Sequence, residues 1–240
     1  METSWVDPDS WEYHKSQYQS PKRSTIWALK VLEEKVKTSE FVIDIGCGGG
    51  GVTTSFAEKF PNVNFLGVDN EKELISFATQ ENNRLRLKNL RFEVADISNL
   101  KGLGNRDGAL LIQTISWLPD YKQALISIFE NLSPRWLFMT GLFYQGEISV
   151  MALVTELKKG RRVFYNTYSI PDVIRFSLDY DYKAEIFPFS IDIDIPKPAD
   201  TDKMSTYTVT SKEDSNRHQI SGPLLLHWHG ILLEKIQKSA

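Results

Sequence analysis

The stretch of sequence that decides the fold is Phe41-Val42-Ile43-Asp44-Ile45-Gly46-Cys47-Gly48-Gly49-Gly50. Its first five residues form a short, mostly apolar run, which is typical of a parallel strand buried on both faces. A glycine-rich turn over 46–51 follows and leads into a predicted helix at 52–59. Without Cβ atoms, Gly46 and Gly48 can adopt positive φ and let a ligand approach the backbone, while Gly50 lets the helix begin close to the strand. We expect the free amides of this turn and of the helix start to receive a carboxylate.

Strands and helices alternate along the chain on both sides of this turn. A helix with one apolar stripe is expected over 21–37, beginning at a Ser20-Pro21 cap. Further strands are expected at 64–68, 90–94, 108–114 and 136–140, and further helices at 71–86 and 120–132. This alternation predicts a doubly wound α/β fold with a parallel sheet, whose ligand lies at the carboxyl ends of the strands.

The chain after residue 140 has a different character. Residues 145–180 are expected to be helical, with a break near 169–172, and 184–195 alternates as a strand. A polar loop over 196–203, a small hairpin formed by 205–210 and 217–221, and a last strand over 224–234 complete the predicted elements. With no repeat or linker, we expect one domain of residues 1–240, made of an N-terminal helical segment (1–37), a ligand-binding half (38–140) and a substrate-side half (141–240) with the hairpin insertion at about 205–221.

Composition and charge narrow the range of partners. The 240 residues are 41% hydrophobic and 25% charged, and 28 basic against 31 acidic residues give a net charge of −3. We therefore expect a small-molecule substrate and no nucleic acid, since binding to a phosphate backbone needs a concentrated positive surface. There is no apolar run of about 18 residues and no signal-peptide pattern, so no membrane association is expected. Cys47, the single cysteine, fits a reducing compartment, and we expect a cytoplasmic protein whose oligomeric state, a homodimer included, stays open.

Residues 41–140 resemble class I S-adenosylmethionine-dependent methyltransferases in the glycine turn, in the acid that ends the second strand, and in the Ala-Asp-Ile step after the third. The resemblance implies a Rossmann-like, seven-stranded, mostly parallel sheet with an antiparallel last strand beside the fifth, an N-terminal helical lid, and S-adenosylmethionine as the cofactor. In this family the glycine turn holds the methionine part of the cofactor, and the acid at the end of the second strand binds both ribose hydroxyls. The Ala-Asp-Ile segment after the third strand binds the adenine. The implied residues are Asp44, Gly46, Cys47, Gly48 and Gly50 at the turn, with Cys47 as a space-filler, Asp69 and Asn70 at the ribose, Asp96 and Ile97 at the adenine, and Gln113 beyond the fourth strand.

Two other functions remain open from the sequence. Gly46, Gly48 and Gly51 also satisfy the G-x-G-x-x-G pattern of a nicotinamide-dependent oxidoreductase, with Asp69 at a plausible distance for the ribose. The acid before the turn, the Ala-Asp-Ile step and the helical N-terminal segment favour the methyl donor instead. A regulatory protein that binds the cofactor without turnover is the second alternative. Structural roles also stay open, with Asp44 as a cap of the turn and Asp96 as a helix N-cap.

The acceptor is expected to be an oxygen or nitrogen of a small molecule, and no metal is expected. A hydroxyl acceptor needs a general base, and the candidates are His14 in the N-terminal segment and His227 and His229 in the last strand, where a buried structural histidine is the alternative. The residues expected to contact the substrate are Tyr13, Tyr18, Trp117, Tyr144, Arg161 and Tyr165, with core packing of the aromatic residues and solvation of the arginine as alternatives. The chain also resembles small bacterial methyltransferases of unassigned substrate, some linked to surface glycans, which implies a sugar or glycan precursor as one acceptor.

Overall fold

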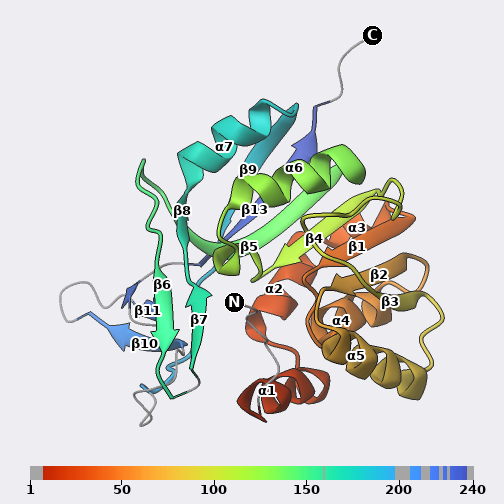
Figure 1. Ribbon diagram of the computed structural model, residues 1–240, viewed down its shortest axis with the longest axis horizontal. Helices are drawn as coiled ribbons and strands as arrows, with labels where there is room; N and C mark the ends of the chain where they lie inside the picture. Colours follow the sequence, from red (N-terminus) through yellow and green to blue (C-terminus); the bar gives the residue numbers. More distant parts are fainter. Residues whose placement is uncertain are drawn as a thin grey trace.

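The computed structural model describes residues 8–158, 160–197, 206–211, 217–221, 224–225 and 228–236. Its centre is one sheet in the order β3-β2-β1-β4-β5-β13-β9 (Figure 1). The strands are β1 (Phe41–Ile45), β2 (Asn64–Asp69), β3 (Leu90–Val94), β4 (Gly108–Ile112), β5 (Trp136–Tyr144), β9 (Tyr182–Pro188) and β13 (Trp228–Lys235). β1 to β5 pair in parallel, whereas β13 is antiparallel to both of its neighbours. The predicted seven-stranded, mostly parallel sheet with an antiparallel last strand beside the fifth is confirmed, and β8 (Thr167–Ser169) adds a short parallel strand at the end of β5.

Helices cover both faces of this sheet (Figure 1). One face packs on α2 (Arg23–Val31), α3 (Glu33–Lys37) and α4 (Gly51–Lys59), the other on α6 (Tyr121–Asn131) and α7 (Ile170–Leu178), and α5 (Lys72–Leu85) lies along β2 and β3. Successive residues of β1 alternate between two cores: Val42 belongs to the core that contains Phe56 of α4, and Ile43 to the core that contains Leu125 of α6. Because both faces are covered, the central strands β1, β4 and β5 are almost wholly buried, whereas the edge strands β3 and β9 are partly exposed.

Between β5 and α7 the structure differs from the sequence prediction. Residues 145–169 are not a helix: β6 (Leu153–Glu156) and β7 (Arg161–Phe164) form an antiparallel hairpin, and β8 follows. Gly160 lies at φ 63°, in the left-handed region, just before β7, and the β-branched Val154, Thr155 and Val163 favour strands. The helical prediction is correct only for α7.

The N-terminal segment also differs from the prediction. α1 (Pro8–Gln19) is followed by a short link, and the helix predicted over 21–37 is two helices, α2 and α3, which meet at Leu32. The predicted cap at Ser20-Pro21 is wrong, because Lys22 is extended (φ −61°, ψ 153°) and α2 begins only at Arg23. No helix in the described part of the chain is long and apolar enough to cross a membrane.

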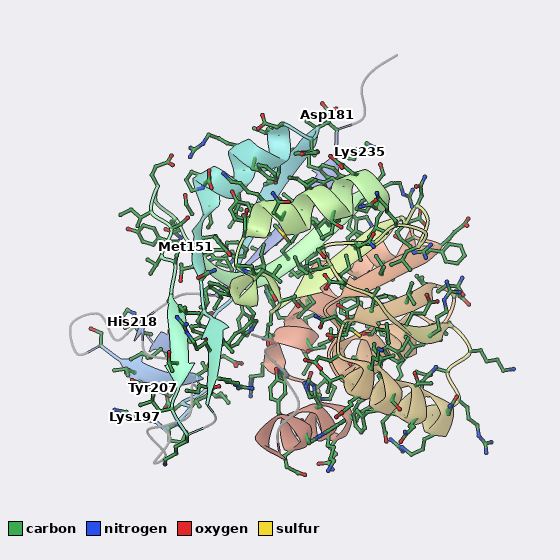
Figure 2. All side chains as sticks on the ribbon, in the orientation of Figure 1. Met151, Asp181, Lys197, Tyr207, His218 and Lys235 are labelled. Atoms are coloured by element: carbon green, nitrogen blue, oxygen red, sulfur yellow. The ribbon has the colours of Figure 1, made fainter. Side chains whose placement is uncertain are left out.

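The C-terminal strands keep their predicted order with shorter bounds. β9 ends at Pro188 rather than near 195, and β13 begins at Trp228 rather than at 224. β10 (Thr206–Thr210) and β11 (Arg217–Ser221) form the predicted hairpin, which β12 (Leu224–Leu225) extends into a small separate sheet. Figure 2 shows Tyr207 and His218 on this small sheet, away from β1, β2 and β3.

Candidate functional site

The glycine turn between β1 and α4 adopts the backbone that its sequence requires. Gly46, Gly48 and Gly50 have φ angles of 71°, 54° and 81°, all in the left-handed region. A Cβ atom on Gly50 would lie 2.6 Å from the ring of Phe92, so this glycine lets α4 begin against β3. β2 and β4 lie on opposite sides of β1, so the turn stands where the strand order reverses, the usual ligand position in an open α/β sheet.

The backbone amides of the turn are already occupied. All five N–H groups from Gly46 to Gly50 donate to acceptors within the protein. The acceptors are the Val68 carbonyl for Gly46 and Cys47 (2.8 and 3.0 Å), Asp69 Oδ2 for Gly48 (2.8 Å), His14 Nδ1 for Gly49 (3.2 Å) and the Cys47 carbonyl for Gly50 (3.0 Å). The expectation that free amides of the turn receive a carboxylate is therefore wrong for these five residues, whereas for the amides at the start of α4 (Gly51–Lys59) it stays a prediction.

Asp69, at the end of β2, joins the turn to the start of α5. Its Oδ2 accepts the Gly48 N–H, and its Oδ1 accepts the Glu71 N–H at 3.0 Å. Burial raises the pKa of this carboxyl, and the backbone N–H groups partly offset the rise. A carboxylate has about four lone-pair positions. Two are used here, so two remain for a diol such as a ribose.

Asp44 is buried beneath the turn, whereas Cys47 is half-buried, with its Sγ beside Gly67 of β2. The Asp44 carboxyl is buried, and its Oδ2 accepts a 2.6 Å hydrogen bond from the hydroxyl of Thr53 in α4. Burial raises the pKa of Asp44 to about 7, against the effect of the Thr53 hydroxyl and aided by the charge of Asp69. Burial also raises the pKa of the Cys47 thiol well above its ordinary value. Both observations favour the structural interpretations, in which Asp44 fastens the turn to α4 and Cys47 fills space.

α1 covers the turn through two side chains. His14 Nδ1 accepts the Gly49 N–H, and the Tyr18 hydroxyl donates to the Gly49 carbonyl at 2.7 Å. A Cβ atom on Gly48 would lie 2.9 Å from His14 Cε1, so the helix can approach this closely only over glycine. Burial, and next the charge of Lys22, lower the pKa of His14 to about 4. An imidazole with this pKa is neutral at pH 7 and a weak base.

Gln113 and Lys22 connect the N-terminal segment to the end of β4. Gln113 has a positive φ of 57°, and its side-chain amide donates to the Ser24 hydroxyl at 3.2 Å. Its Oε1 accepts from Lys22 Nζ at 3.2 Å. The same ammonium donates to the Tyr13 hydroxyl and lies 3.9 Å from the centre of the Tyr13 ring. Sequence analysis identified Gln113 and Tyr13 but missed Lys22 and Ser24, because no local pattern distinguishes them from surface residues.

The residues expected at the adenine follow β3. Asp96 Oδ1 accepts hydrogen bonds from the Ser98 N–H (2.8 Å) and hydroxyl (2.7 Å), which fold 96–99 into a turn rather than the start of a helix. Ile97 is half-buried against the core, and Asn70, beside Asp69, is exposed. Asp96 and Asp69 therefore end neighbouring strands at the same edge of the sheet.

The expected substrate residues separate into a buried pair and exposed positions. Trp117 and the buried Tyr165 are in contact, with ring centroids 4.8 Å apart. Tyr144 and Tyr13 are 49% and 45% exposed. Arg161 pairs with Glu156 across the β6–β7 hairpin, so its charge is matched within the protein.

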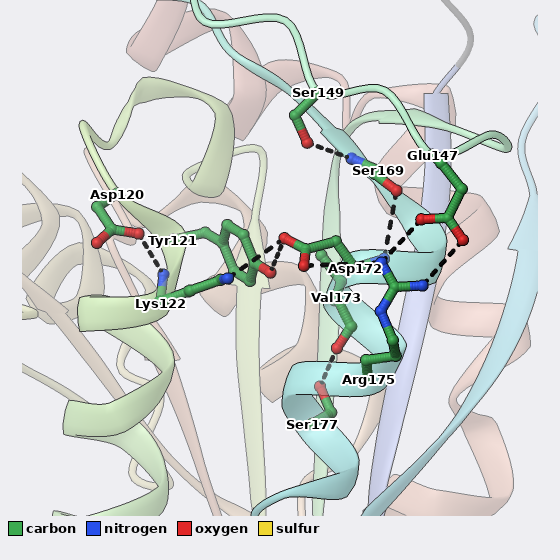
Figure 3. A network of polar contacts seen from close by, with 10 residues as sticks. All are labelled: Asp120, Tyr121, Lys122, Glu147, Ser149, Ser169, Asp172, Val173, Arg175 and Ser177. Atoms are coloured by element: carbon green, nitrogen blue, oxygen red, sulfur yellow. Dashed lines mark hydrogen bonds and ion pairs between the residues drawn. The ribbon is translucent and has the colours of Figure 1, made fainter.

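A polar network fixes the segment between β5 and α7 (Figure 3). Asp172 accepts from the Tyr121 hydroxyl at 2.6 Å, and Arg175 forms two 2.8 Å hydrogen bonds with the carboxylate of Glu147. The N–H of Ser169 donates to the Ser149 hydroxyl at 2.9 Å. These contacts join residues 147–149 to α6 and α7, on the side of the sheet opposite α4.

Of the three histidines expected as bases, two lie in the described part of the chain. His14 is placed on the turn as above. His229 is buried in β13, opposite Gly141 of β5 and Pro188 of β9. His227 lies outside the described residues, so its role as a candidate base stays a prediction.

Comparison with known proteins identifies the family to which this chain belongs. A family model described as a methyltransferase domain matches residues 37–168. The trans-aconitate 2-methyltransferase of Deinococcus radiodurans is 31% identical over 128 residues, which are 53% of this chain and 45% of that protein. The malonyl-[acyl-carrier protein] O-methyltransferase of Bacillus cereus is 30% identical over 144 residues, 59% and 52% of the two chains. The chain thus spans about half the length of these curated relatives.

A solved structure, that of the YcgJ protein of Bacillus subtilis, aligns over 90% of this chain and 99% of its own with a TM-score of 0.63 and 15% identity, which is a likeness of fold. The family match, by contrast, covers more than half of this chain and includes the glycine turn, Asp69 and Asp96. It does not support the nicotinamide alternative, and it confirms S-adenosylmethionine as the cofactor of the family. The chain belongs to the class I S-adenosylmethionine-dependent methyltransferases.

Proposed function

We propose that this chain transfers a methyl group from S-adenosylmethionine to an oxygen or nitrogen of a small molecule. The observation that carries the proposal is Asp69, which fixes the glycine turn and keeps two lone-pair positions for the ribose hydroxyls. Asp96, with Oδ1 used in its own turn, keeps Oδ2 for the exocyclic amine of the adenine, and Ile97 lies beside it. The turn, with Gly46, Gly48 and Gly50, provides the space for the methionine part.

The chemistry divides between the cofactor and the protein. When bound, S-adenosylmethionine supplies an electrophilic methyl group that is displaced in line by the acceptor. The protein has to align the acceptor and exclude water. We assign exclusion of water to α1, which covers the turn through His14 and Tyr18, and the wall of the acceptor side to the Trp117–Tyr165 pair.

The low pKa of His14 bears on which chemical groups can accept the methyl group. With a pKa of about 4, His14 is a poor acceptor for the proton that a hydroxyl would have to release. A hydroxyl acceptor would therefore need His227 or His229 as its base, and without one of them we favour an acceptor that arrives without a proton to lose, namely a carboxylate or a neutral amine. Two of the relatives are named for trans-aconitate and for a malonyl group as their substrates. Both substrates carry a carboxyl group, which supports a carboxylate as the acceptor. A sugar or glycan precursor stays an untested prediction.

Calorimetry and a turnover screen test this function. The purified protein should bind S-adenosylmethionine and S-adenosylhomocysteine and should not bind NADH; the reverse result would refute the proposal. Release of S-adenosylhomocysteine should then be measured with a panel of tricarboxylates and dicarboxylates, neutral amines and sugars. Turnover confined to the sugars would refute the acceptor class, and cofactor binding with no turnover on any panel member would favour the regulatory alternative.

A further inference from the structure

Lys22 holds a positive charge among neutral partners. Its ammonium contacts the Gln113 carbonyl oxygen at 3.2 Å and the hydroxyl and ring of Tyr13. Among the described residues, no carboxylate lies within ion-pair distance of it, whereas the next residue, Arg23, pairs with Asp192 at 2.5 Å. A half-buried ammonium without an anionic partner has lost hydration that only part of these contacts replaces.

The neighbours of Lys22 place its ammonium over the glycine turn. Gln113 ends β4, and the side chain of the next residue, Thr114, lies over Gly46, where a Cβ atom would be 2.5 Å away. On the other side, His14 sits on Gly48 and Gly49, and the charge of Lys22 lowers the pKa of this histidine. The ammonium therefore lies at the carboxyl end of β4, beside the turn to which the proposed function assigns the methionine part of the cofactor.

The turn itself offers that part no hydrogen-bond donor between residues 46 and 50, because all five amides have protein acceptors. The α-carboxylate of the cofactor nevertheless needs a partner when it leaves water. We propose that Lys22 binds the α-carboxylate of S-adenosylmethionine, in an ion pair that completes the cofactor site. Lys22 precedes residues 37–168, so the family match does not assign it.

The inference rests on the proposed function, and direct binding measurements separate the two. Wild-type protein is first titrated with S-adenosylhomocysteine and with its decarboxylated analogue, S-adenosyl-3-thiopropylamine. If neither binds, the proposed function fails. If S-adenosylhomocysteine binds, the role of Lys22 is tested with Lys22→Met, which keeps the length of the side chain without its charge.

Lys22→Met should lower the affinity for S-adenosylhomocysteine by about tenfold or more, as expected for loss of a charge-assisted contact. The affinity for the decarboxylated analogue should stay within about twofold of the wild-type value. Lys22→Arg should keep most of the affinity for S-adenosylhomocysteine. The matched control is Arg23→Met, next in the chain and paired with Asp192, which should change neither affinity. Unfolding temperatures of all variants identify any that fail to fold, and Lys22→Gln replaces Lys22→Met in that case.

Two results would overturn the proposal. An equal loss of affinity for both ligands in Lys22→Met would mean that Lys22 acts on the adenosine part or on the shape of the site. Unchanged affinity for S-adenosylhomocysteine, together with a raised KM for a carboxylate acceptor, would mean that the carboxylate recognised by Lys22 belongs to the acceptor rather than to the donor.

Discussion

Replacing Asp69 by asparagine tests how the protein holds the cofactor. In the wild type, both carboxylate oxygens accept backbone hydrogen bonds, from Gly48 at 2.8 Å and Glu71 at 3.0 Å, and two lone-pair positions remain. Asparagine has one carbonyl oxygen and an NH₂ group that only donates. Its single oxygen cannot accept both backbone N–H groups and two ribose hydroxyls, so the variant must give up contacts to the turn, to the ribose, or to both.

The magnitude follows from this count. Loss of one hydrogen bond from a ribose hydroxyl to the charged carboxylate weakens binding by about 1.5–3 kcal/mol, or about 10- to 150-fold in the affinity for S-adenosylhomocysteine. Loss of the hydrogen bond from the Gly48 N–H to the carboxylate lowers the free energy of unfolding by a similar amount, about 1.5–3 kcal/mol. We expect Asp69→Asn to fold, with a loss of stability and a separate loss of affinity in the folded protein.

Calorimetry with S-adenosylhomocysteine and urea denaturation of the ligand-free protein measure the two effects separately. Glu73→Gln, the same acid-to-amide change at an exposed position in the first turn of α5, is the control and should change neither quantity much. A folded Asp69→Asn protein with wild-type affinity would refute the reasoning, because ribose recognition would then lie elsewhere. Strong destabilisation without the ligand would show that Asp69 acts mainly on the fold of the turn.

Three further predictions concern residues around the turn. The pKa of Asp44 is about 7 in the folded protein and near 3.9 in the unfolded chain, so the wild type should lose stability as the pH rises from about 4 to 7. Asp44→Asn lacks this titration, so its free energy of unfolding relative to the wild type should rise over the same range in urea titrations. In His14→Asn, the amide oxygen replaces Nδ1 as the acceptor of the Gly49 N–H. Because the pKa of His14 is about 4, the pH dependence of turnover between about pH 6 and 8 should be the same as in the wild type. Loss of an inflection in that range would identify His14 as the base. Gly50→Ala combines positive φ with a Cβ atom 2.6 Å from Phe92 and should lower the free energy of unfolding by about 2–4 kcal/mol, against about 1 kcal/mol for Gly160→Ala, which meets nothing within 4 Å; equal losses would contradict the packing argument.

The central strands of the cofactor half are predictable because they are buried on both faces. Such strands appear in the sequence as short apolar runs, and β1 has the predicted bounds without change. β3, at the edge of the sheet and mostly exposed, also has its predicted bounds. The segment from 145 to 169 is harder, because β6 and β7 are half-exposed strands with little apolar contrast. There the β-branched residues and the positive φ of Gly160 decide the structure, and these local signals are weaker than a helical apolar spacing.

The residues of the candidate site also differ in how well the sequence predicts them. The glycines and Asp69 are close in sequence and follow strand ends, so a motif identifies them. Lys22 and Asn166 carry no motif, because their roles depend on partners far along the chain. Lys22 reaches Gln113, and the buried side chain of Asn166 binds the Leu118 carbonyl at 2.8 Å and the Ala152 N–H at 3.0 Å, which ties the β6–β7 arm to the end of β4.

The occupied amides also explain why the turn suits a methyl donor better than a dinucleotide. A nicotinamide enzyme binds the pyrophosphate through free N–H groups of its glycine turn and the following helix. Here residues 46–50 donate to Val68, Cys47, Asp69 and His14, so a pyrophosphate would find no donor among these five amides. The methionine part of S-adenosylmethionine carries a single carboxylate, which one cation such as Lys22 can neutralise from outside the turn. The glycines let Thr114, His14 and Phe92 pack against the turn, and the choice of cofactor falls to the side chains around it.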